Sequence, residues 1–329
     1  MAGRSNQTRP TALEAPVPGF HTTPWEATMT LSSTGTGRTD TSELPYNGKA
    51  VKDRFSPLSP DSVPQNSPGF WVILQRQTLL VTTASATVQL PHGPLPEGLQ
   101  PLAAPVGIGL WQGQPLRAAR IAEDAPLPAG CEAFPFFGPD QRLDVGLATL
   151  AGRANQIMHW ERRSRFCSVC GGETTRIPTT WGKRCGVCRE MHFPHIHPCV
   201  IVLVKRGDEF MLIRKAGAVP GRFSPIAGFV DFGESLEECV QREVHEEVGL
   251  NIANIRYLGS QNWPFPSQQM IGFLADYVDG EPKPDGVEVI EAHWLTGDAI
   301  PDTSGGSRSI ARWMLENFAI NGQQPAPCR

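Results

Sequence analysis

The chain of 329 residues carries a formal net charge of -4, with 29 Lys and Arg against 33 Asp and Glu. This length suffices for two or three domains with separate cores. The charge excludes a globally basic nucleic-acid coat, although it leaves room for a local basic patch. No apolar run approaches the ~20 residues of a membrane-spanning helix, and the N-terminus lacks the apolar segment of a secretory signal. We therefore expect a soluble cytoplasmic protein that does not bind a membrane.

The first segment, residues 1–65, is rich in Pro, Ser, Thr and Gly and poor in large apolar residues. Such a composition predicts a mostly disordered or weakly ordered tail, with room for one strand that the sequence does not place. From Gly69 onward, FWVILQRQTLLVTT and PVGIGLWQGQPLRAARIAE are rich in β-branched and aromatic residues. They predict a β-rich N-terminal domain over residues 66–150.

The next segment, LDVGLATLAGRANQIMHWERRSRF from Leu143, has apolar residues at helical spacing. It predicts a helix that leads into a four-cysteine ribbon, and together they form a linking region over residues 151–195. The stretch HPCVIVLVKRGDEFMLIRK then predicts a β-hairpin with a fully apolar first strand. A glutamate-rich helix, further strands and a final helix around SIARWMLENFA complete an α/β domain at 196–322, before a tail at 323–329.

The cysteine cluster has the pattern CxxC-x14-CxxC, formed by Cys167, Cys170, Cys185 and Cys188. Each CxxC pair can coordinate an ion with two thiolates, and two pairs complete a closed tetrahedral site for one structural Zn2+. A redox CxxC motif needs one pair only and leaves the second unexplained.

The ribbon is also locally basic, with seven Lys or Arg against three Glu between residues 161 and 190. Most basic clusters of this kind are simply solvent-exposed surface. The alternative is a phosphate-rich partner such as RNA, contacted through its backbone. The basic residues are Arg162, Arg163, Arg165, Arg176, Lys183, Arg184 and Arg189.

The glutamate-rich helix is predicted within GFVDFGESLEECVQREVHEEVGL, residues 228–250. Ser235 and Glu238 have the spacing of a capping box, and Gly249 suits the residue that ends a helix. These signals place the helix between Ser235 and Gly249.

Three glutamates of this helix share a face with apolar residues, at 100° per residue. Glu243, Glu246 and Glu247 lie among Cys239 and Val244 on this helical wheel. Helical glutamates more often form a solvent face, but carboxylates turned toward protein are costly to desolvate unless a cation lies among them. Oxygen ligands favour a hard ion such as Mg2+ or Mn2+.

At every position this segment resembles the Nudix box, G-x5-E-x7-R-E-U-x-E-E-x-G-U, where U is aliphatic. The matching residues are Gly228, Glu234, Arg242, Glu243, Val244, Glu246, Glu247, Gly249 and Leu250. The resemblance implies an α/β/α Nudix sandwich. It also implies hydrolysis of a nucleoside diphosphate linked to a second group, with box glutamates holding the metal ions.

A second stretch, SQNWPFPSQQM from Ser260, resembles the SQPWPFPxS signature of the NADH pyrophosphatase family. Members of that family also carry a four-cysteine zinc ribbon before the Nudix domain and a further N-terminal domain. The likeness therefore covers roughly residues 69–320. Asn262 replaces the usual Pro and Gln268 the usual Ser, with Ser267 one place early, so selectivity between NADH, NAD+ and their analogues stays open.

The resemblance implies that this loop borders a dinucleotide site, and its flanking prolines limit the entropy lost on binding. The alternative interpretation is that Trp263 and Phe265 are core residues that anchor a turn. The implied base-holding rings are Phe193 and Phe229. The other implied substrate contacts are Gln261, Asn262, Trp263, Pro264, Phe265, Pro266, Ser267, Gln268 and Ala311.

The resemblance further implies metal ligands in the carboxylates of Glu243, Glu246, Glu247 and Glu288 and the backbone carbonyl of Ala227. Arg242 is expected to brace Glu234 or Glu243 rather than touch substrate. Either Glu247 or Glu288 could act as general base. The products would be AMP and nicotinamide mononucleotide, and the family's sites are built at a homodimer interface.

Two other functions stay open. The same site, with the basic ribbon, could act on NAD-capped RNA 5′ ends. Alternatively, the chain could be a non-catalytic dinucleotide sensor, although the intact REVHEE run argues against this because a sensor needs no metal ligands.

Overall fold

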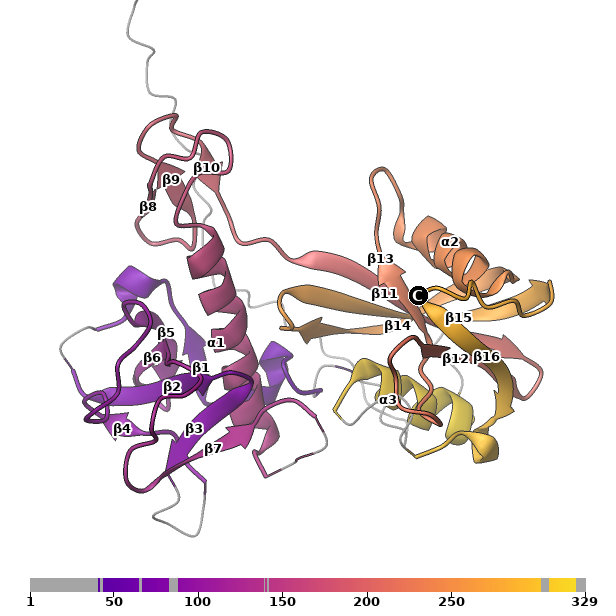
Figure 1. Cartoon of the computed structure of the whole chain (residues 1–329), viewed down its shortest axis with the longest axis horizontal. Helices are drawn as coiled ribbons and strands as arrows, with labels where there is room; N and C mark the ends of the chain where they lie inside the picture. Colours follow the sequence, from indigo (N-terminus) through magenta and orange to yellow (C-terminus); the bar gives the residue numbers. More distant parts are fainter. Residues whose placement is uncertain are drawn as a thin grey trace, which may run out of the picture. The chain divides into compact units, whose positions relative to one another are not determined.

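The computed structural model describes residues 41, 44–64, 67–82, 88–138, 140, 142–302 and 308–323. In these residues, two larger β-sheets are separated along the chain by a helix and a small three-stranded sheet (Figure 1). None of the helices in this part of the chain is long and apolar enough to cross a membrane.

The N-terminal sheet has the strand order β1-β5-β6-β2-β3-β7, with β4 paired to β2. Its β2 and β6 run parallel, and the other pairs are antiparallel. The strands are β1 (Phe55–Pro57), β2 (Gly69–Gln75), β3 (Thr78–Thr82), β4 (His92–Gly93), β5 (Val106–Trp111), β6 (Gln114–Arg120) and β7 (Cys131–Pro135). This sheet confirms the expected β-rich N-terminal region.

Part of the expected tail is instead folded. In residues 44–64, the short 3-10 helices η2 (Gly48–Val51) and η3 (Pro60–Ser62) flank β1. Tyr46, Val51 and Phe55 are buried in the N-terminal core. The prediction of a tail to residue 65 was wrong here because a few well-spaced large residues suffice to dock a segment on an existing core, whatever its average composition. Residues 1–40 and the expected tail from 324 lie outside the described residues.

Helix α1 (Val145–Arg163) begins at Asp144, whose side chain accepts a hydrogen bond from the Leu147 N–H at 2.9 Å. Leu150, Ala151 and Ala154 are fully buried against the N-terminal sheet. The helix expected as a linker is therefore part of the N-terminal core in its first half, and the boundary predicted at residue 150 falls inside it.

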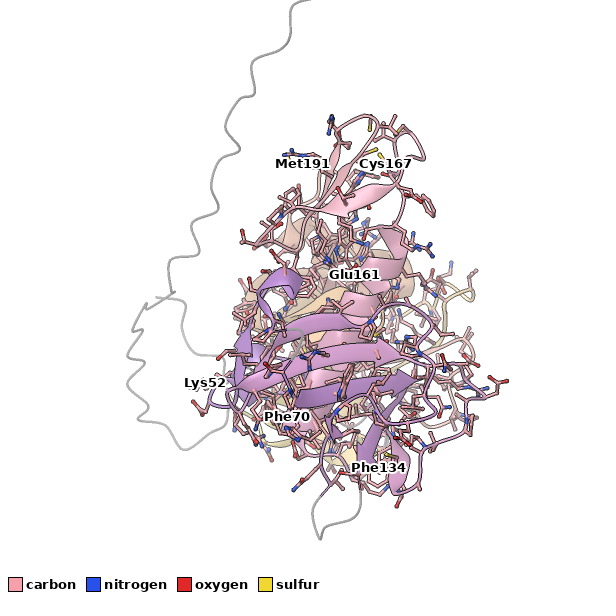
Figure 2. All side chains as sticks on the ribbon, turned by 90° about the vertical axis from the view of Figure 1, so that its left-hand side faces the viewer. Lys52, Phe70, Phe134, Glu161, Cys167 and Met191 are labelled. Carbon is pink, nitrogen blue, oxygen red and sulfur yellow. The ribbon has the colours of Figure 1, made fainter. Side chains whose placement is uncertain are left out.

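The second half of α1 holds the ribbon, which consists of β8 (Thr174–Arg176), β9 (Lys183–Cys185) and β10 (Met191–His192). Glu161 accepts ion pairs from Lys183 and Arg176, both at 2.9 Å. Lys183 is buried, so this pairing compensates a charge that would otherwise be costly. Glu161 on the helix and Cys167 and Met191 in the ribbon are labelled in Figure 2.

The C-terminal sheet has the order β14-β15-β11-β12-β16, with β13 paired to β11. Helix α2 covers one face and α3 with a π-helical turn, η5, covers the other (Figure 1). This arrangement confirms the expected α/β/α sandwich. The elements are β11 (His197–Arg206), β12 (Glu209–Lys215), β13 (Ile226–Phe229), α2 (Leu236–Val248), β14 (Asn251–Trp263), β15 (Gln268–Asp279), β16 (Val289–Thr296), η4 (Gly297–Ala299), α3 (Ile310–Met314) and η5 (Leu315–Ile320).

The two sheets share one connectivity. The order β5-β6-β2-β3-β7 corresponds strand by strand to β14-β15-β11-β12-β16, and β4 corresponds to β13. The central pairs, β2 with β6 and β11 with β15, are parallel in both. Residues 94–105, between β4 and β5, are all described and form no helix. The N-terminal sheet thus repeats the frame of the C-terminal one without the helix that carries the glutamates.

Candidate active site

Helix α2 begins and ends where its sequence predicts. The Ser235 side chain accepts from the Glu238 N–H at 3.2 Å, and the Glu238 carboxylate accepts from the Ser235 N–H at 2.7 Å, which is a complete capping box. Gly249 ends the helix in the left-handed conformation, with φ of 72°. The position of α2 over β13 then brings the Glu243 carboxyl against Gly228 of that strand.

The contacts of Gly228 in β13 explain why the motif has a glycine at this position. A Cβ atom at this position would overlap the carboxyl group of Glu243. The missing side chain therefore lets Glu243 approach the strand backbone, beside the Ala227 carbonyl.

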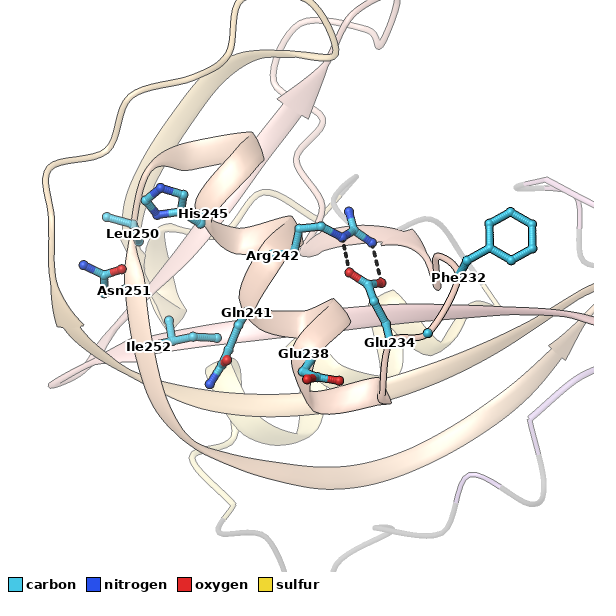
Figure 3. Close-up of a pocket in the computed structure, with 10 residues that line it drawn as sticks. Phe232, Glu234, Glu238, Gln241, Arg242, His245, Leu250, Asn251 and Ile252 are labelled. Carbon is cyan, nitrogen blue, oxygen red and sulfur yellow. Dashed lines mark hydrogen bonds and ion pairs between the residues drawn. The ribbon is translucent and has the colours of Figure 1, made fainter.

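Arg242 braces the carboxylates around it, as expected. Its guanidinium donates to Glu243 Oε1 at 2.8 Å and to Glu246 Oε2 at 2.9 Å. It also donates to Glu234 Oε2 at 2.9 Å (Figure 3). The hydrogen bonds from Arg242 lower the pKa of Glu234 to about 2. Since another guanidinium hydrogen bond goes to the Phe229 carbonyl at 2.9 Å, Arg242 fixes α2 to the end of β13.

The three glutamates do not share one environment. Glu247 is 4% exposed, and the Glu243 side chain is 13% exposed. The Glu246 side chain is 60% exposed and pairs with Arg242. The expectation that Glu246 faces protein was therefore wrong, because it lies at the margin of the apolar face, where a long side chain reaches water.

Glu247 is paired with a lysine that the sequence analysis missed. Lys215 Nζ, at the end of β12, donates to Glu247 Oε1 and to the Ala227 carbonyl, both at 2.9 Å. The other oxygen of Glu247, Oε2, is buried and has no hydrogen-bond partner among the described residues. Burial raises the pKa of Glu247 to about 6, against the opposing effect of Lys215 and with a further increase from Glu243 and Glu288.

These groups fit a divalent cation held by oxygen. The Ala227 carbonyl and one oxygen of the buried Glu247 carboxylate already bind a cationic group, the Lys215 ammonium, and the second Glu247 oxygen is unused. The Glu243 carboxyl lies against Gly228, the next residue of β13. Glu288 lies just before β16, where its carbonyl accepts from the Ala216 N–H at 2.8 Å, so it neighbours Lys215.

Lys215→Met should tighten Mn2+ binding about tenfold, which corresponds to ~1.5 kcal/mol for one hydrogen bond to a charged group. The reason is that the ammonium and the metal compete for the same two oxygen atoms. Titration of free Mn2+ by electron paramagnetic resonance measures this directly. Lys205→Met, the same change on β11, is the control and should leave Mn2+ affinity unchanged. Weaker Mn2+ binding by Lys215→Met would contradict the competition.

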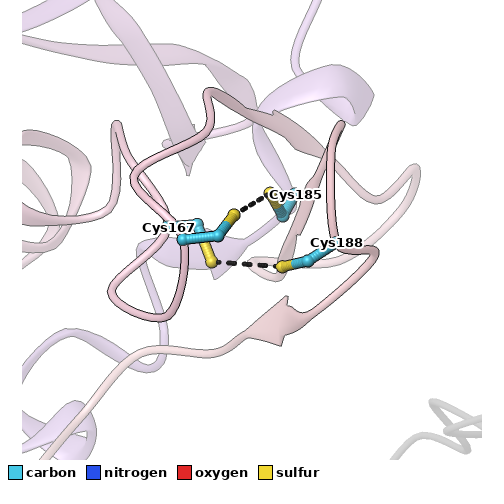
Figure 4. A group of neighbouring side chains, drawn as sticks. Cys167, Cys185 and Cys188 are labelled. Atoms are coloured by element: carbon cyan, nitrogen blue, oxygen red, sulfur yellow. Dashed lines mark hydrogen bonds between the residues drawn. The ribbon is translucent and has the colours of Figure 1, made fainter.

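The four cysteines meet in the ribbon as expected, with all sulfur atoms within 4.8 Å of one another (Figure 4). Cys167 and Cys188 Sγ are 3.6 Å apart, and Cys170 and Cys185 Sγ are 3.5 Å apart. Tetrahedral zinc with Zn–S bonds of ~2.3 Å requires about 3.8 Å, so the cluster fits Zn2+. Backbone N–H groups led by that of Cys188 lower the pKa of Cys185 to about 6, which favours the thiolate.

The SQNWPFP loop is held by a segment that precedes η2. Gln261 is fully buried: its Nε2 donates to the Pro45 carbonyl at 2.9 Å, and its Oε1 accepts from the Ile310 N–H at 2.7 Å. A direct contact of the Gln261 amide with a ligand would require one of these bonds to break. The N–H of Asn262 donates to Asn47 Oδ1 at 2.8 Å. A Pro at position 262 has no N–H, so the departure from the family signature serves a contact within this chain.

Asn47→Ala and Asn262→Pro should each lower the free energy of unfolding by about 1–3 kcal/mol, because each removes one partner of a partly buried hydrogen bond and leaves the other unpaired. The effects should not add, since both break the same bond. Denaturant unfolding of the two single variants and the double variant measures this coupling. Strictly additive losses would mean that the Asn47 contact does not hold the loop.

Trp263 and Phe265 pack against the N-terminal core. Their ring centroids lie 5.9 and 5.5 Å from that of Tyr46, and Phe265 stacks on Phe136 at 5.8 Å. These side chains thus anchor a turn, which is the alternative that the sequence left open. Of the remaining expected contacts, Phe193 and Phe229 are 41% and 52% exposed, and Ser267 is buried beside His197. Ala311 is a buried residue of α3, Gln268 is the first residue of β15, and the Pro264 carbonyl accepts from Asn155.

Three family descriptions match this chain in sequence order. They are an NADH pyrophosphatase-like rudimentary NUDIX domain at residues 68–160, an NADH pyrophosphatase zinc ribbon domain at 162–193 and a NUDIX domain at 195–314. The first agrees with the repeated sheet that lacks α2.

Similar proteins include one named "NAD-capped RNA hydrolase NudC" from Pseudomonas aeruginosa (strain LESB58), 42% identical over 66% of this chain and 78% of the relative. A protein of the same name from Yersinia pseudotuberculosis (serotype O:1b) is 40% identical over 77% of this chain and 92% of the relative. A crystal structure of a NUDIX hydrolase from Nitrosomonas europaea aligns with 49% of this chain and 95% of its own, at 26% identity and a TM-score of 0.42. With its zinc ribbon, its complete Nudix box and these relatives, the chain belongs to the NADH pyrophosphatase family of Nudix hydrolases.

Proposed function

We propose that this protein hydrolyses the pyrophosphate of NADH or NAD+ to AMP and nicotinamide mononucleotide. The observation that carries the proposal is the buried Glu247 carboxylate in a complete Nudix box: one of its oxygens shares the Lys215 ammonium with the Ala227 carbonyl, and the other is unused. The family to which the chain belongs supports a hydrolase that acts on pyrophosphate bonds.

Glu243, Glu247, Glu288 and the Ala227 carbonyl would hold Mg2+ or Mn2+, with Glu246 able to join them if it leaves Arg242. The bound metal would neutralise developing charge on the pyrophosphate and lower the pKa of the attacking water. Arg242 keeps Glu243 in place through a hydrogen bond of 2.8 Å. Glu247 or Glu288 would accept the proton of the water. A Lys215 ammonium released from Glu247 would lie within reach of the substrate phosphates.

The flat base of the substrate would stack on Phe229, which is half exposed one residue beyond Gly228 in β13. Phe193, in the segment after the ribbon, would supply the second ring. Stacking on an aromatic ring is worth about 1–3 kcal/mol per base. We further propose that the protein is a cytoplasmic homodimer, in which the two rings come together at one site.

Removal of NAD caps from RNA is the second candidate. Relatives carry this activity in their names, and the ribbon region from 161 to 190 has seven Lys or Arg against three Glu. Such a surface suits the RNA backbone.

The first test is product analysis of the purified protein with NADH or NAD-capped RNA, in Mg2+ or Mn2+. AMP with reduced nicotinamide mononucleotide from NADH, or 5′-monophosphate RNA from capped RNA, would support hydrolysis at this site. Binding of NADH without any metal-dependent turnover of either substrate would overturn the proposal and favour a dinucleotide sensor.

A further inference from the structure

A cavity of about 570 Å3 lies between α1, the ribbon and the SQNWPFP loop. Its wall includes Arg153, Trp160 and Arg163 from α1 and Trp181 from the ribbon. Among the described residues, none of the carboxylates of the candidate metal site lines it, and no other Asp or Glu does. The function proposed above gives no role to Arg153, Trp160 or Trp181.

The wall of the cavity combines flat rings with unused donors. Trp160 is half buried, and its ring lies 5.9 Å from that of His195, centroid to centroid. Arg153 Nε and Gln156 Nε2 are buried and have no hydrogen-bond partner among the described residues. Burial lowers the pKa of Arg153, as expected for a cation without an acidic neighbour. The aromatic rings of the wall suit a flat ligand group, and its cations and amide donors, with no carboxylate among them, suit an anionic group. A nucleotide has both.

The cavity also lies near the candidate metal site without being part of it. His197 lines the cavity and starts β11, and four residues further on Ile201 pairs with Ala227. At ~3.3 Å per residue, this separation along the strand is about 13 Å. Pro266 and Ser267, at the end of the loop proposed to border the dinucleotide, also line the cavity.

We propose that this cavity binds the nucleotide that follows the cap in NAD-capped RNA. The base stacks against Trp160 and His195, while Arg153 and Arg163 pair with the adjoining phosphate. This inference rests on the proposed function, because it presupposes that the pyrophosphate of the cap lies at the glutamates. Free NADH has no such nucleotide, so the cavity would favour capped RNA over free NADH.

Two changes test the cavity without touching the glutamates or the core. The double variant Arg163→Gln/His195→Ala removes one charge and one ring from exposed positions, and Ile196→Trp fills the cavity from a lining side chain that is 47% exposed. The matched control is Arg76→Gln, which removes the same charge from a side chain that is 68% exposed and lies outside both the cavity wall and the basic ribbon region.

Both variants should lower kcat/KM for an NAD-capped RNA of about ten nucleotides at least about tenfold, given that stacking is worth 1–3 kcal/mol per base. Turnover of NADH should stay within about twofold, and Arg76→Gln should change RNA turnover less than about threefold. Fluorescence anisotropy with the same RNA carrying only a 5′-monophosphate should show the same loss of affinity.

An equal loss for NADH and capped RNA would overturn the proposal, because the cavity would then belong to the dinucleotide site. Unchanged RNA turnover and affinity in both variants would overturn it as well. Failure of the wild type to cleave either substrate would refute the proposed function instead, and the anisotropy of the uncapped RNA would still decide whether the cavity binds RNA.

Discussion

Glu247→Gln should lower kcat/KM for NADH at least about 100-fold while the protein stays folded. A metal ion contributes several kcal/mol of transition-state stabilisation, and 100-fold corresponds to about 2.7 kcal/mol. Gln keeps an oxygen that can accept from Lys215 but loses the negative charge that binds the metal. Because Glu247 is 4% exposed, the neutral side chain also removes a desolvated charge, so the metal-free fold should not be weakened.

Steady-state kinetics, Mn2+ titration and thermal unfolding of the same preparation separate these effects. The control is Glu237→Gln, the same change on an exposed position of α2, which should keep full activity. Full activity in Glu247→Gln would show that Glu247 neither holds the metal nor accepts the proton. A loss of activity together with unfolding would show that the Glu247 charge supports the fold instead.

The pKa of Glu247 gives this prediction a pH dependence with a definite sign. Burial raises the pKa from 4.5 to about 6, so the folded metal-free protein holds a proton that the unfolded chain releases. The contribution of Glu247 to the free energy of unfolding is therefore fully present below pH 4.5 and is lost as the pH rises through about 6. Mn2+ needs the ionised form, so its affinity should fall as the pH drops below about 6. Glu247→Gln should show neither dependence.

Cys185→Ser should abolish zinc binding and unfold the ribbon. Cys185 is fully buried and supplies one of four sulfur atoms within 4.8 Å of one another. Structural zinc contributes about 10–16 kcal/mol of folding free energy in small zinc domains, and the ribbon has only three short strands to replace it. Elemental analysis should find one zinc per wild-type chain and none in the variant.

Limited proteolysis should then cut Cys185→Ser between residues 164 and 193, whereas α1 and the C-terminal sheet resist. Cys131→Ser is the matched control, because Cys131 lies in β7 outside the cluster and should keep zinc and protease resistance. A ribbon that resists proteolysis without zinc would mean that the Glu161 ion pairs and the short sheet suffice to fold it.

The sequence by itself predicted those features whose residues are close along the chain. The caps of α2, the bracing by Arg242 and the four-cysteine cluster all involve residues within about 20 positions of one another. Helical periodicity and turn geometry bring such residues together whatever the rest of the chain does. The sequence alone therefore predicts these three features.

The tertiary structure decided the features that depend on long-range packing. Lys215 meets Glu247 across 32 residues, and Gln261 meets the Pro45 carbonyl across 216. No local pattern distinguishes Lys215 from any other lysine at a strand end, and the composition of residues 1–65 gave no sign that Tyr46 would dock on the SQNWPFP loop. Local spacing along the chain thus determined which residues of the Nudix box carry the chemistry. The packing of distant segments determined the partners of Glu247 and of the SQNWPFP loop. The reason is that the free energy of folding of such contacts depends on burial and on whether each buried polar group finds a partner.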